Sequence, residues 1–232
     1  MHVTASDTTS TSQRAYAYIR SKLEDGDYAP GTRLVTRTIA KEIGSSLNPV
    51  REALSRLSTQ GLIDHVPGAG SSVREPNKRE VAELYCLREA LESQAAFLAA
   101  TRIQPDKLDE LDAICAQWQQ LAEDLEAESD ARLDNAESRR EWIETEKRFH
   151  RIIISAAGNN LLASACDDYL VLSAIFERHL QQPTLLTLEL VRQVASSHTA
   201  LVESLRNGDG QAARDQTAAM IRLGCRKTLQ AK

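Results

Sequence analysis

The chain has 232 residues and a formal net charge of −5, which suits one large or two small domains and argues against a protein that coats nucleic acid along its whole surface. The charge is unevenly distributed: residues 1–79 carry 11 Lys and Arg against 8 Asp and Glu, a net charge of +3, whereas residues 80–232 carry −8. No apolar run is long enough to span a bilayer and the first residues lack the core of a signal peptide, so we expect a cytoplasmic protein with no membrane contact.

The first third of the sequence predicts three helices and a hairpin. After a Ser- and Thr-rich tail over residues 1–12, which we expect to be disordered, helices are predicted over residues 13–25, 36–43 and about 47–60. The third helix has apolar residues at the spacing i, i+3, i+4 and i+7: Val50, Ala53, Leu54 and Leu57. Apolar runs on both sides of the turn at residues 67–70 predict a β-hairpin. Three helices followed by a hairpin are the pattern of a winged helix-turn-helix.

The opposite face of the third predicted helix is polar. It carries Asn48, Arg51, Ser55 and Arg56. Small polar groups and arginine at a helix N-terminus suit phosphates and base edges, which favours DNA binding. An ordinary solvated surface helix is the alternative interpretation of this stretch alone, and the neighbouring helix and hairpin favour DNA binding.

A family resemblance is carried by the stretches "TRTIAKEIGSSLNPVREALSRLSTQGLI" and "PGAGSSV". They resemble the GntR family of bacterial transcription regulators, and the resemblance covers most of residues 13–75. It implies that the operator is contacted by five residues: Arg37, Ser46, Asn48, Arg51 and, at the tip of the wing, Gly68. Leu47 and Ala69 stand where many relatives carry arginine, which implies fewer bidentate contacts with guanine and a different operator.

Beyond a predicted linker at residues 76–80, the pattern over residues 81–232 stays helical to the end. The first helix of this part has a candidate apolar stripe: Leu84, Leu87, Leu91, Ala95 and Leu98. Residues 126–140 are almost all polar, which leaves a solvated helix extension and a loop as alternatives. No strands or repeats are evident. The predicted fold class is therefore mainly α, with a winged helix-turn-helix domain over residues 13–75 and an all-α bundle of about seven helices after the linker.

Three stretches of the helical part carry a second resemblance: "LREALESQAAFLAATR", "EKRFHRIIISAAGNN" and "SSHTALVESLRNGDGQAARDQTAAMI". They resemble the FadR subfamily, whose C-terminal FCD domain binds a small effector. In that family a pocket inside the bundle often holds a divalent metal through an aspartate and three histidines. The corresponding residues of this chain are Glu146, His150, His198 and Met220.

The residues at these positions leave two interpretations open. Glu146 and His150 are i, i+4 neighbours that can chelate one ion, and with His198 and water they would suit Zn²⁺ or Ni²⁺. Met220 is a poor ligand for such ions, and glutamate is one methylene longer than aspartate. The alternative is that His150 and His198 are hydrogen-bonded interior residues of a metal-free pocket, which Met220 favours.

Arg88 matches an arginine on the first helix of many such domains. The resemblance implies that Arg88, together with the four pocket residues, binds an effector carboxylate through bidentate hydrogen bonds. The alternative is an i, i+4 ion pair between Arg88 and Glu92. Asn159 is expected to cap a helix rather than contact the ligand.

These features together predict a homodimeric DNA-binding transcription regulator. We expect a repressor that leaves double-stranded operator DNA when a small carboxylate metabolite binds to its C-terminal domain. The alternative is a helical metalloenzyme that uses Glu146, His150 and His198. Di-iron bundles need paired Glu-x-x-His motifs, whereas the single spacing here is Glu-x-x-x-His, and neither a Walker loop nor a His-Glu-x-x-His motif is present. We therefore do not expect an enzyme.

Overall fold

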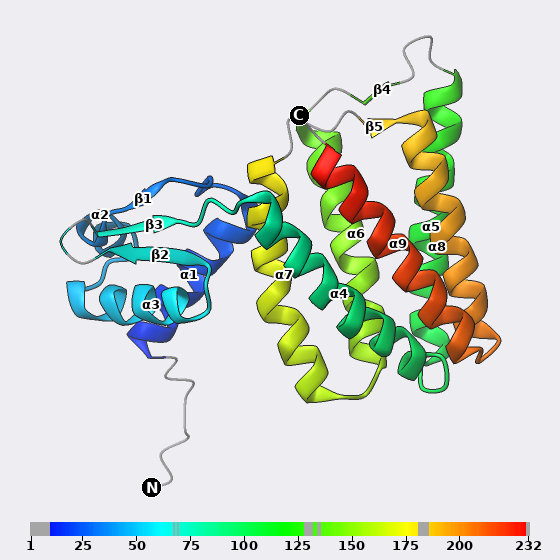
Figure 1. Cartoon of the computed structure of the whole chain (residues 1–232), viewed down its shortest axis with the longest axis horizontal. Coiled ribbons are helices and arrows are strands. Elements are labelled where there is room, and N and C mark those ends of the chain that lie inside the picture. Colours follow the sequence, from blue (N-terminus) through cyan, green and yellow to red (C-terminus); the bar gives the residue numbers. More distant parts are fainter. Residues whose placement is uncertain are drawn as a thin grey trace, which may run out of the picture. The chain divides into compact units, whose positions relative to one another are not determined.

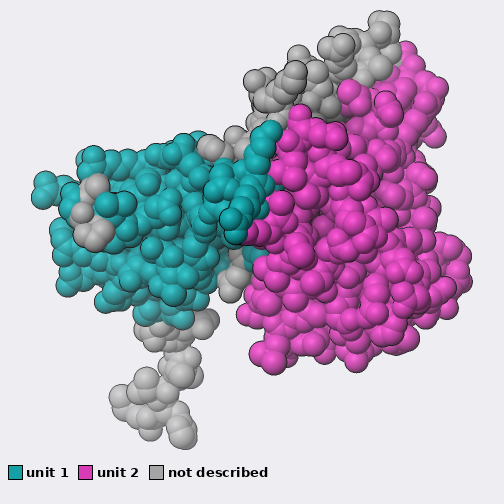
Figure 2. Space-filling view, viewed as in Figure 1, with its two compact units in different colours: residues 1–81, 168–180 teal, residues 82–167, 181–232 magenta. Residues whose placement is uncertain are grey.

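The computed structural model describes residues 10–66, 68, 70–127, 132–133, 136–180 and 186–230. The chain forms two compact units (Figure 2). The first contains the residues up to Val81 together with Asp168–Leu180, and the second contains Ala82–Asp167 and the residues from Gln181 onwards. Helix α7 (Asn160–Leu180) contributes to both units. The domain limits drawn from the sequence stay a prediction.

The first unit contains the three predicted helices and the predicted hairpin (Figure 1). Its elements in chain order are α1 (Thr11–Asp25), β1 (Arg33–Leu34), α2 (Thr36–Glu42), α3 (Leu47–Thr59), β2 (Ile63–Val66) and β3 (Gly70–Val73). Strands β2 and β3 pair antiparallel, with Ile63 opposite Val73. Strand β1 pairs with β3 and completes a sheet of order β1-β3-β2. The sequence did not indicate β1, because two residues are too few to show an alternating pattern.

Packing of α1 against α3 forms the core of this unit. The fully buried apolar side chains of the two helices are Ala15, Ile19 and Leu23 on α1 and Val50, Ala53 and Leu57 on α3. The Tyr16 hydroxyl donates a 2.9 Å hydrogen bond to Gln60 Oε1 and ties α1 to the end of α3. Helix α1 begins two residues before its predicted start because Ser10 and Gln13 form a capping box.

The segment that leads into α4 (Lys78–Ala99) is held by a second capping box. The backbone N–H of Glu80 donates to Asn77 Oδ1 at 3.0 Å, and the backbone N–H of Asn77 donates to Glu80 Oε2 at 2.9 Å. Arg74 also pairs with Glu80, and its guanidinium lies 5.6 Å from the centroid of the Phe176 ring. The backbone N–H of Asn77 and then the Arg74 side chain hold the pKa of the Glu80 carboxyl below its usual value.

The second unit is a helical bundle (Figure 1). Its elements are most of α4, α5 (Pro105–Ala127), β4 (Arg132–Leu133), α6 (Ala136–Ala156), the start of α7, β5 (Leu186–Thr187), α8 (Leu188–Arg206) and α9 (Gly210–Gln230). The described part of the chain thus has six helices after the head, where the sequence predicted about seven. Strands β4 and β5 pair antiparallel over two residues, so the prediction that this part lacks strands was wrong. Strands of two residues are too short to show an alternating pattern of apolar and polar residues.

The core of the bundle is built around large side chains. Trp118, Phe149, Leu111 and Leu201 are buried in one cluster to which α4, α5, α6, α8 and α9 contribute. The predicted inward face of α4 was partly wrong. Leu87 is 48% exposed, whereas the buried positions follow another stripe: Val81, Leu84, Tyr85, Glu92, Ala95, Ala96 and Ala99. None of the described helices combines the length and the apolar character of a membrane span.

Two leucine-to-alanine variants of the second unit test the assignment of its core. Leu111 is 0% exposed and Leu161 is 85% exposed. Leu111→Ala leaves a cavity in the bundle and should lower the free energy of unfolding by about 2–5 kcal/mol in urea titrations. Leu161→Ala should change it by less than about 0.5 kcal/mol. Equal effects of the two substitutions would contradict the assignment.

The lowered pKa of Glu80 predicts a pH-dependent contribution to stability. An acid whose pKa is lowered by folding stabilises the native state above its unfolded pKa and loses that contribution as the pH falls. Wild type should therefore be more stable than Glu80→Gln at pH 7, by less than about 1 kcal/mol because solvent screens the pair. The difference should shrink as the pH is lowered below 4.5, the ordinary pKa of a glutamate carboxyl. A difference that grows on acidification would be inconsistent with this assignment.

Candidate functional site

The exposed face of α3 is the first candidate site. Packing of Val50, Ala53 and Leu57 against α1 leaves Asn48 and Arg51 exposed to solvent. Ser46 is the N-cap residue of α3, but its side chain makes no capping hydrogen bond and is exposed. Arg37 is exposed on α2, the helix that precedes α3 and packs against it. All four predicted contact residues of the two helices are thus accessible to a partner.

The hairpin after α3 has Gly68 in its turn. Its φ of +81° lies in the left-handed region, which a residue with a side chain adopts only with strain. A Cβ added there would meet no atom within 4 Å, so the backbone conformation rather than lack of space requires glycine. Ala69, where the sequence departs from many relatives, lies outside the described residues.

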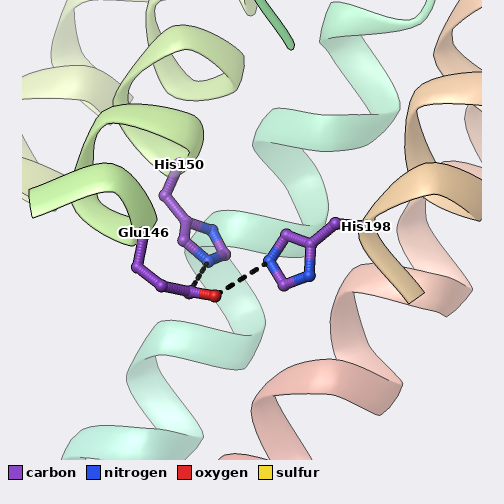
Figure 3. A group of neighbouring side chains, drawn as sticks. All are labelled: Glu146, His150 and His198. Atoms are coloured by element: carbon purple, nitrogen blue, oxygen red, sulfur yellow. Dashed lines mark ion pairs between the residues drawn. The ribbon is translucent and has the colours of Figure 1, made fainter. Parts of the chain in front are cut away.

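The second candidate site lies inside the bundle and joins α6 to α8 (Figure 3). Glu146 and His150 extend from successive turns of α6, and His198 extends from α8. The Glu146 carboxylate lies between the two rings: its Oε2 is 3.6 Å from His150 Nε2 and its Oε1 is 3.7 Å from His198 Nε2. One ligand atom from each of the three residues lies within 4.8 Å of the others. The structure therefore brings together the three residues that the sequence proposed as metal ligands.

The tautomer of His198 follows from its hydrogen bond. His198 Nδ1 is 2.8 Å from the carbonyl oxygen of Val194, and because a carbonyl oxygen only accepts, Nδ1 must carry the proton. Burial lowers the pKa of His198, which favours the neutral ring. The other nitrogen, Nε2, then carries a lone pair and is directed towards Glu146.

A lone pair directed at a carboxylate is unfavourable unless a cation or a hydrogen-bond donor lies between the two groups. His198 Nε2 and Glu146 Oε1 are both buried, and neither has a hydrogen-bond partner among the described protein groups. Two buried acceptors that face each other need a cation or a donor to bridge them. Ligand atoms of a tetrahedral zinc site lie about 3.4 Å apart, given bonds of about 2.0–2.1 Å, close to the separations of Glu146 from the two rings. The residues present therefore fit a divalent cation.

His150 has a carboxylate on each side. Its Nδ1 lies 3.2 Å from Glu92 Oε2, on the side opposite Glu146. Burial acts to lower the pKa of His150, but Glu146 and Glu92 outweigh it and raise the pKa. Burial also acts to raise the pKa of Glu146, which His198 and His150 nevertheless lower. In the metal-free protein this favours a charged His150 ring, whose Nε2 proton a metal ion would replace.

Arg88 makes the ion pair that was the alternative to effector binding. Its Nε donates a 2.9 Å hydrogen bond to Glu92 Oε1, and Glu92 is only 2% exposed. Met220 is partly buried and packs against the core cluster. Asn159 caps α7 as expected, because its Oδ1 accepts the backbone N–H of Leu162 at 3.1 Å.

The sequence interpretation missed Glu92 as a member of this site. It placed Leu87 and Leu91 on the inward face of α4, which turns Glu92 away from the bundle. The observed inward stripe runs through Tyr85, Arg88 and Glu92, spaced by three and four residues, and that spacing was available in the sequence. The carbonyl of Val194 could not have been found, because a backbone acceptor leaves no signal in residue identity.

Two protein families match the chain. Residues 83–223 match the FCD domain, and residues 11–73 match the family described as bacterial regulatory proteins, gntR family. The HTH-type transcriptional regulator McbR of Escherichia coli (strain K12) is 35% identical over 105 residues, which are 45% of this chain and 48% of McbR. The match thus spans about half the length of McbR. The HTH-type transcriptional repressor GlaR of the same organism is 24% identical over 199 residues, covering 85% of this chain and 86% of GlaR.

A solved structure shows the same fold. E. coli McbR/YncC superimposes with a TM-score of 0.78 at 23% identity, covering 96% of this chain and 99% of that chain. The FCD match alone covers more than half of the chain, and the gntR match covers the unit that contains α2, α3 and the hairpin. The chain therefore belongs to the FCD-domain family and carries a gntR-type winged helix over residues 11–73.

Proposed function

We propose that the protein is a homodimeric transcriptional repressor of the FadR subfamily that binds operator DNA through residues 13–75 and a small carboxylate effector through residues 81–232. The observation that carries the proposal is the exposed polar face of α3, with Asn48 and Arg51 accessible above a buried apolar face. GlaR and the probable D-xylose utilization operon repressor of Paenarthrobacter nicotinovorans, 25% identical over 211 residues, are both described as repressors, which supports this direction of control.

In this proposal the effector binds at a divalent metal, Zn²⁺ or Ni²⁺, held by Glu146, His150 and His198. The facing acceptors Glu146 Oε1 and His198 Nε2 support the ion, and its open coordination positions would accept the effector's carboxylate. Arg88 is paired with Glu92, so the ion rather than Arg88 carries most of the attraction for the carboxylate. Effector binding releases DNA only if the effector prefers the arrangement of the heads that does not fit the operator.

Substitution of Arg51 tests the DNA-binding face. If Arg51 contacts a base, Arg51→Ala should weaken operator binding by about 1–3 kcal/mol and relax the sequence preference at one position. If it contacts a phosphate, the variant should bind all DNA sequences more weakly. The slope of log K against log salt concentration should then decrease in magnitude by about one. Arg222→Ala, which removes the same charge from α9, should leave binding unchanged in fluorescence anisotropy titrations. Unchanged binding by Arg51→Ala at every salt concentration would reject the proposed face.

Assembly in the absence of DNA tests the proposed dimer. One winged helix makes too few contacts for tight specific binding, and a two-fold protein reads two matching half-sites. The full chain should therefore sediment as a dimer at micromolar concentration without DNA. Because we place the interface in the helical part, Arg51→Ala should sediment in the same way. A monomer that dimerises only on operator DNA would contradict this placement.

Metal content tests the proposed pocket. The chain purified without a His-tag should bind about one Zn²⁺ or Ni²⁺ by elemental analysis, and His150→Ala should remove most of it. His65→Ala, a histidine substitution in the wing, should have no effect. Met220→His should tighten binding by adding a nitrogen ligand if residue 220 reaches the ion. Fewer than about one ion per ten chains after the metal is added would exclude the metal site.

A further inference from the structure

Glu92 is a buried carboxylate that contacts both the Arg88 guanidinium and the candidate metal ligand His150. It lies on α4 and is 2% exposed. Its Oε1 accepts the hydrogen bond from Arg88, and its Oε2 lies 3.2 Å from His150 Nδ1. Among the described groups Oε2 has no hydrogen-bond partner, and its contact with His150 is that of an ion pair. A carboxylate that only balanced Arg88 would not need to direct its second oxygen at the ring of His150.

The two histidines of the site have matching arrangements. His198 has its Nδ1 hydrogen-bonded to the Val194 carbonyl, and His150 has its Nδ1 facing Glu92, so each ring presents Nε2 to Glu146. A histidine that ligates a metal through one nitrogen usually donates its other N–H to a carboxylate or carbonyl, which fixes the orientation and tautomer of the ring. The Val194 carbonyl lies on α8, the same helix as His198. Glu92, by contrast, lies on α4, whereas His150 lies on α6.

We propose that Glu92 is a positioning residue for the metal site: it holds His150 with Nδ1–H directed at α4 and Nε2 directed at the ion. This inference rests on the metal part of the proposed function and adds a residue from a third helix to it. Arg88 keeps the Glu92 carboxylate in place through Oε1 and so supports the same arrangement. The role of Arg88 is then to orient Glu92 and not to bind the effector.

Two variants separate positioning from simple charge balance. Glu92→Gln keeps an acceptor next to His150 but removes the negative charge. Arg88→Met with Glu92→Leu removes the acceptor and leaves no buried charge without a partner, so it protects the test if Glu92→Gln folds poorly. Glu89→Gln is the matched control, because Glu89 lies on the same helix and pairs at 2.6 Å with Arg222. Thermal unfolding without metal checks that each variant folds.

The affinity for Zn²⁺, measured by competition with a chromophoric chelator, is the first readout. We expect Glu92→Gln and the double variant to bind Zn²⁺ about 10–100-fold more weakly than wild type, and Glu89→Gln to bind like wild type. If Glu92 only balanced Arg88, the double variant would bind Zn²⁺ like wild type, and that result would overturn the proposal. If Glu92→Gln and the double variant each bound Zn²⁺ with wild-type affinity, that result would overturn the proposal as well.

The ring nitrogens of the two histidines give a second readout by ¹H–¹⁵N NMR of the Zn²⁺-loaded protein. The Nδ1–H of His150 should be protected from exchange in wild type and lost in the double variant. The Nδ1–H of His198, held by Val194, should persist in both and serves as an internal control. A His150 signal that is unchanged in the double variant would overturn the positioning role. A wild-type chain that binds no Zn²⁺ would overturn the metal part of the proposed function as well, so the two failures are distinguishable.

Discussion

The central constraint of the helical unit is a pair of buried hydrogen-bond acceptors 3.7 Å apart, Glu146 Oε1 on α6 and His198 Nε2 on α8. Leaving such atoms without a partner costs several kcal/mol in a low-dielectric interior. Aromatic side chains surround them: the Phe149 and Trp118 rings lie 4.6 and 4.8 Å from the His198 ring. The apolar core that stabilises the bundle thus also lines the polar cluster of Glu146, His150 and His198.

The same pair of acceptors bears on the two interpretations that Met220 leaves open. A missing fourth ligand favours a metal-free pocket of hydrogen-bonded histidines. In that pocket each ring would find a donor or acceptor partner on both nitrogens. The Val194 carbonyl instead fixes the proton of His198 on the far nitrogen and turns a lone pair towards a carboxylate, an arrangement that suits three protein ligands with exchangeable positions left for water or effector. In the proposed metal site, methionine at position 220 would leave one more coordination position open.

In the head, the face of α3 that we propose for DNA binding lies opposite the face that packs in the core. The apolar face of α3 is buried against α1 and leaves no freedom in which side chains point outward. The residues that we propose for operator contact are therefore fixed in direction by the core, and the turn at Gly68 is fixed by its left-handed backbone. The uneven charge of the chain follows the same division, because the basic excess lies in residues 1–79 and the acidic excess in the rest.

The resemblance to FCD domains implied Glu146, His150 and His198 as candidate ligands. The sequence by itself determined the helices of the head, the hairpin and the helical character of the remainder, because periodicity and local motifs are properties of neighbouring positions. It assigned Glu146 and His150 to one helix face through their i, i+4 spacing. Only the tertiary structure decided that His198 and Glu92 reach the same point from other helices, and that Leu87 is exposed while Glu92 is buried. An apolar stripe shifted by one residue turns a helix by about 100°, so which face is inward depends on the packing of all the helices together.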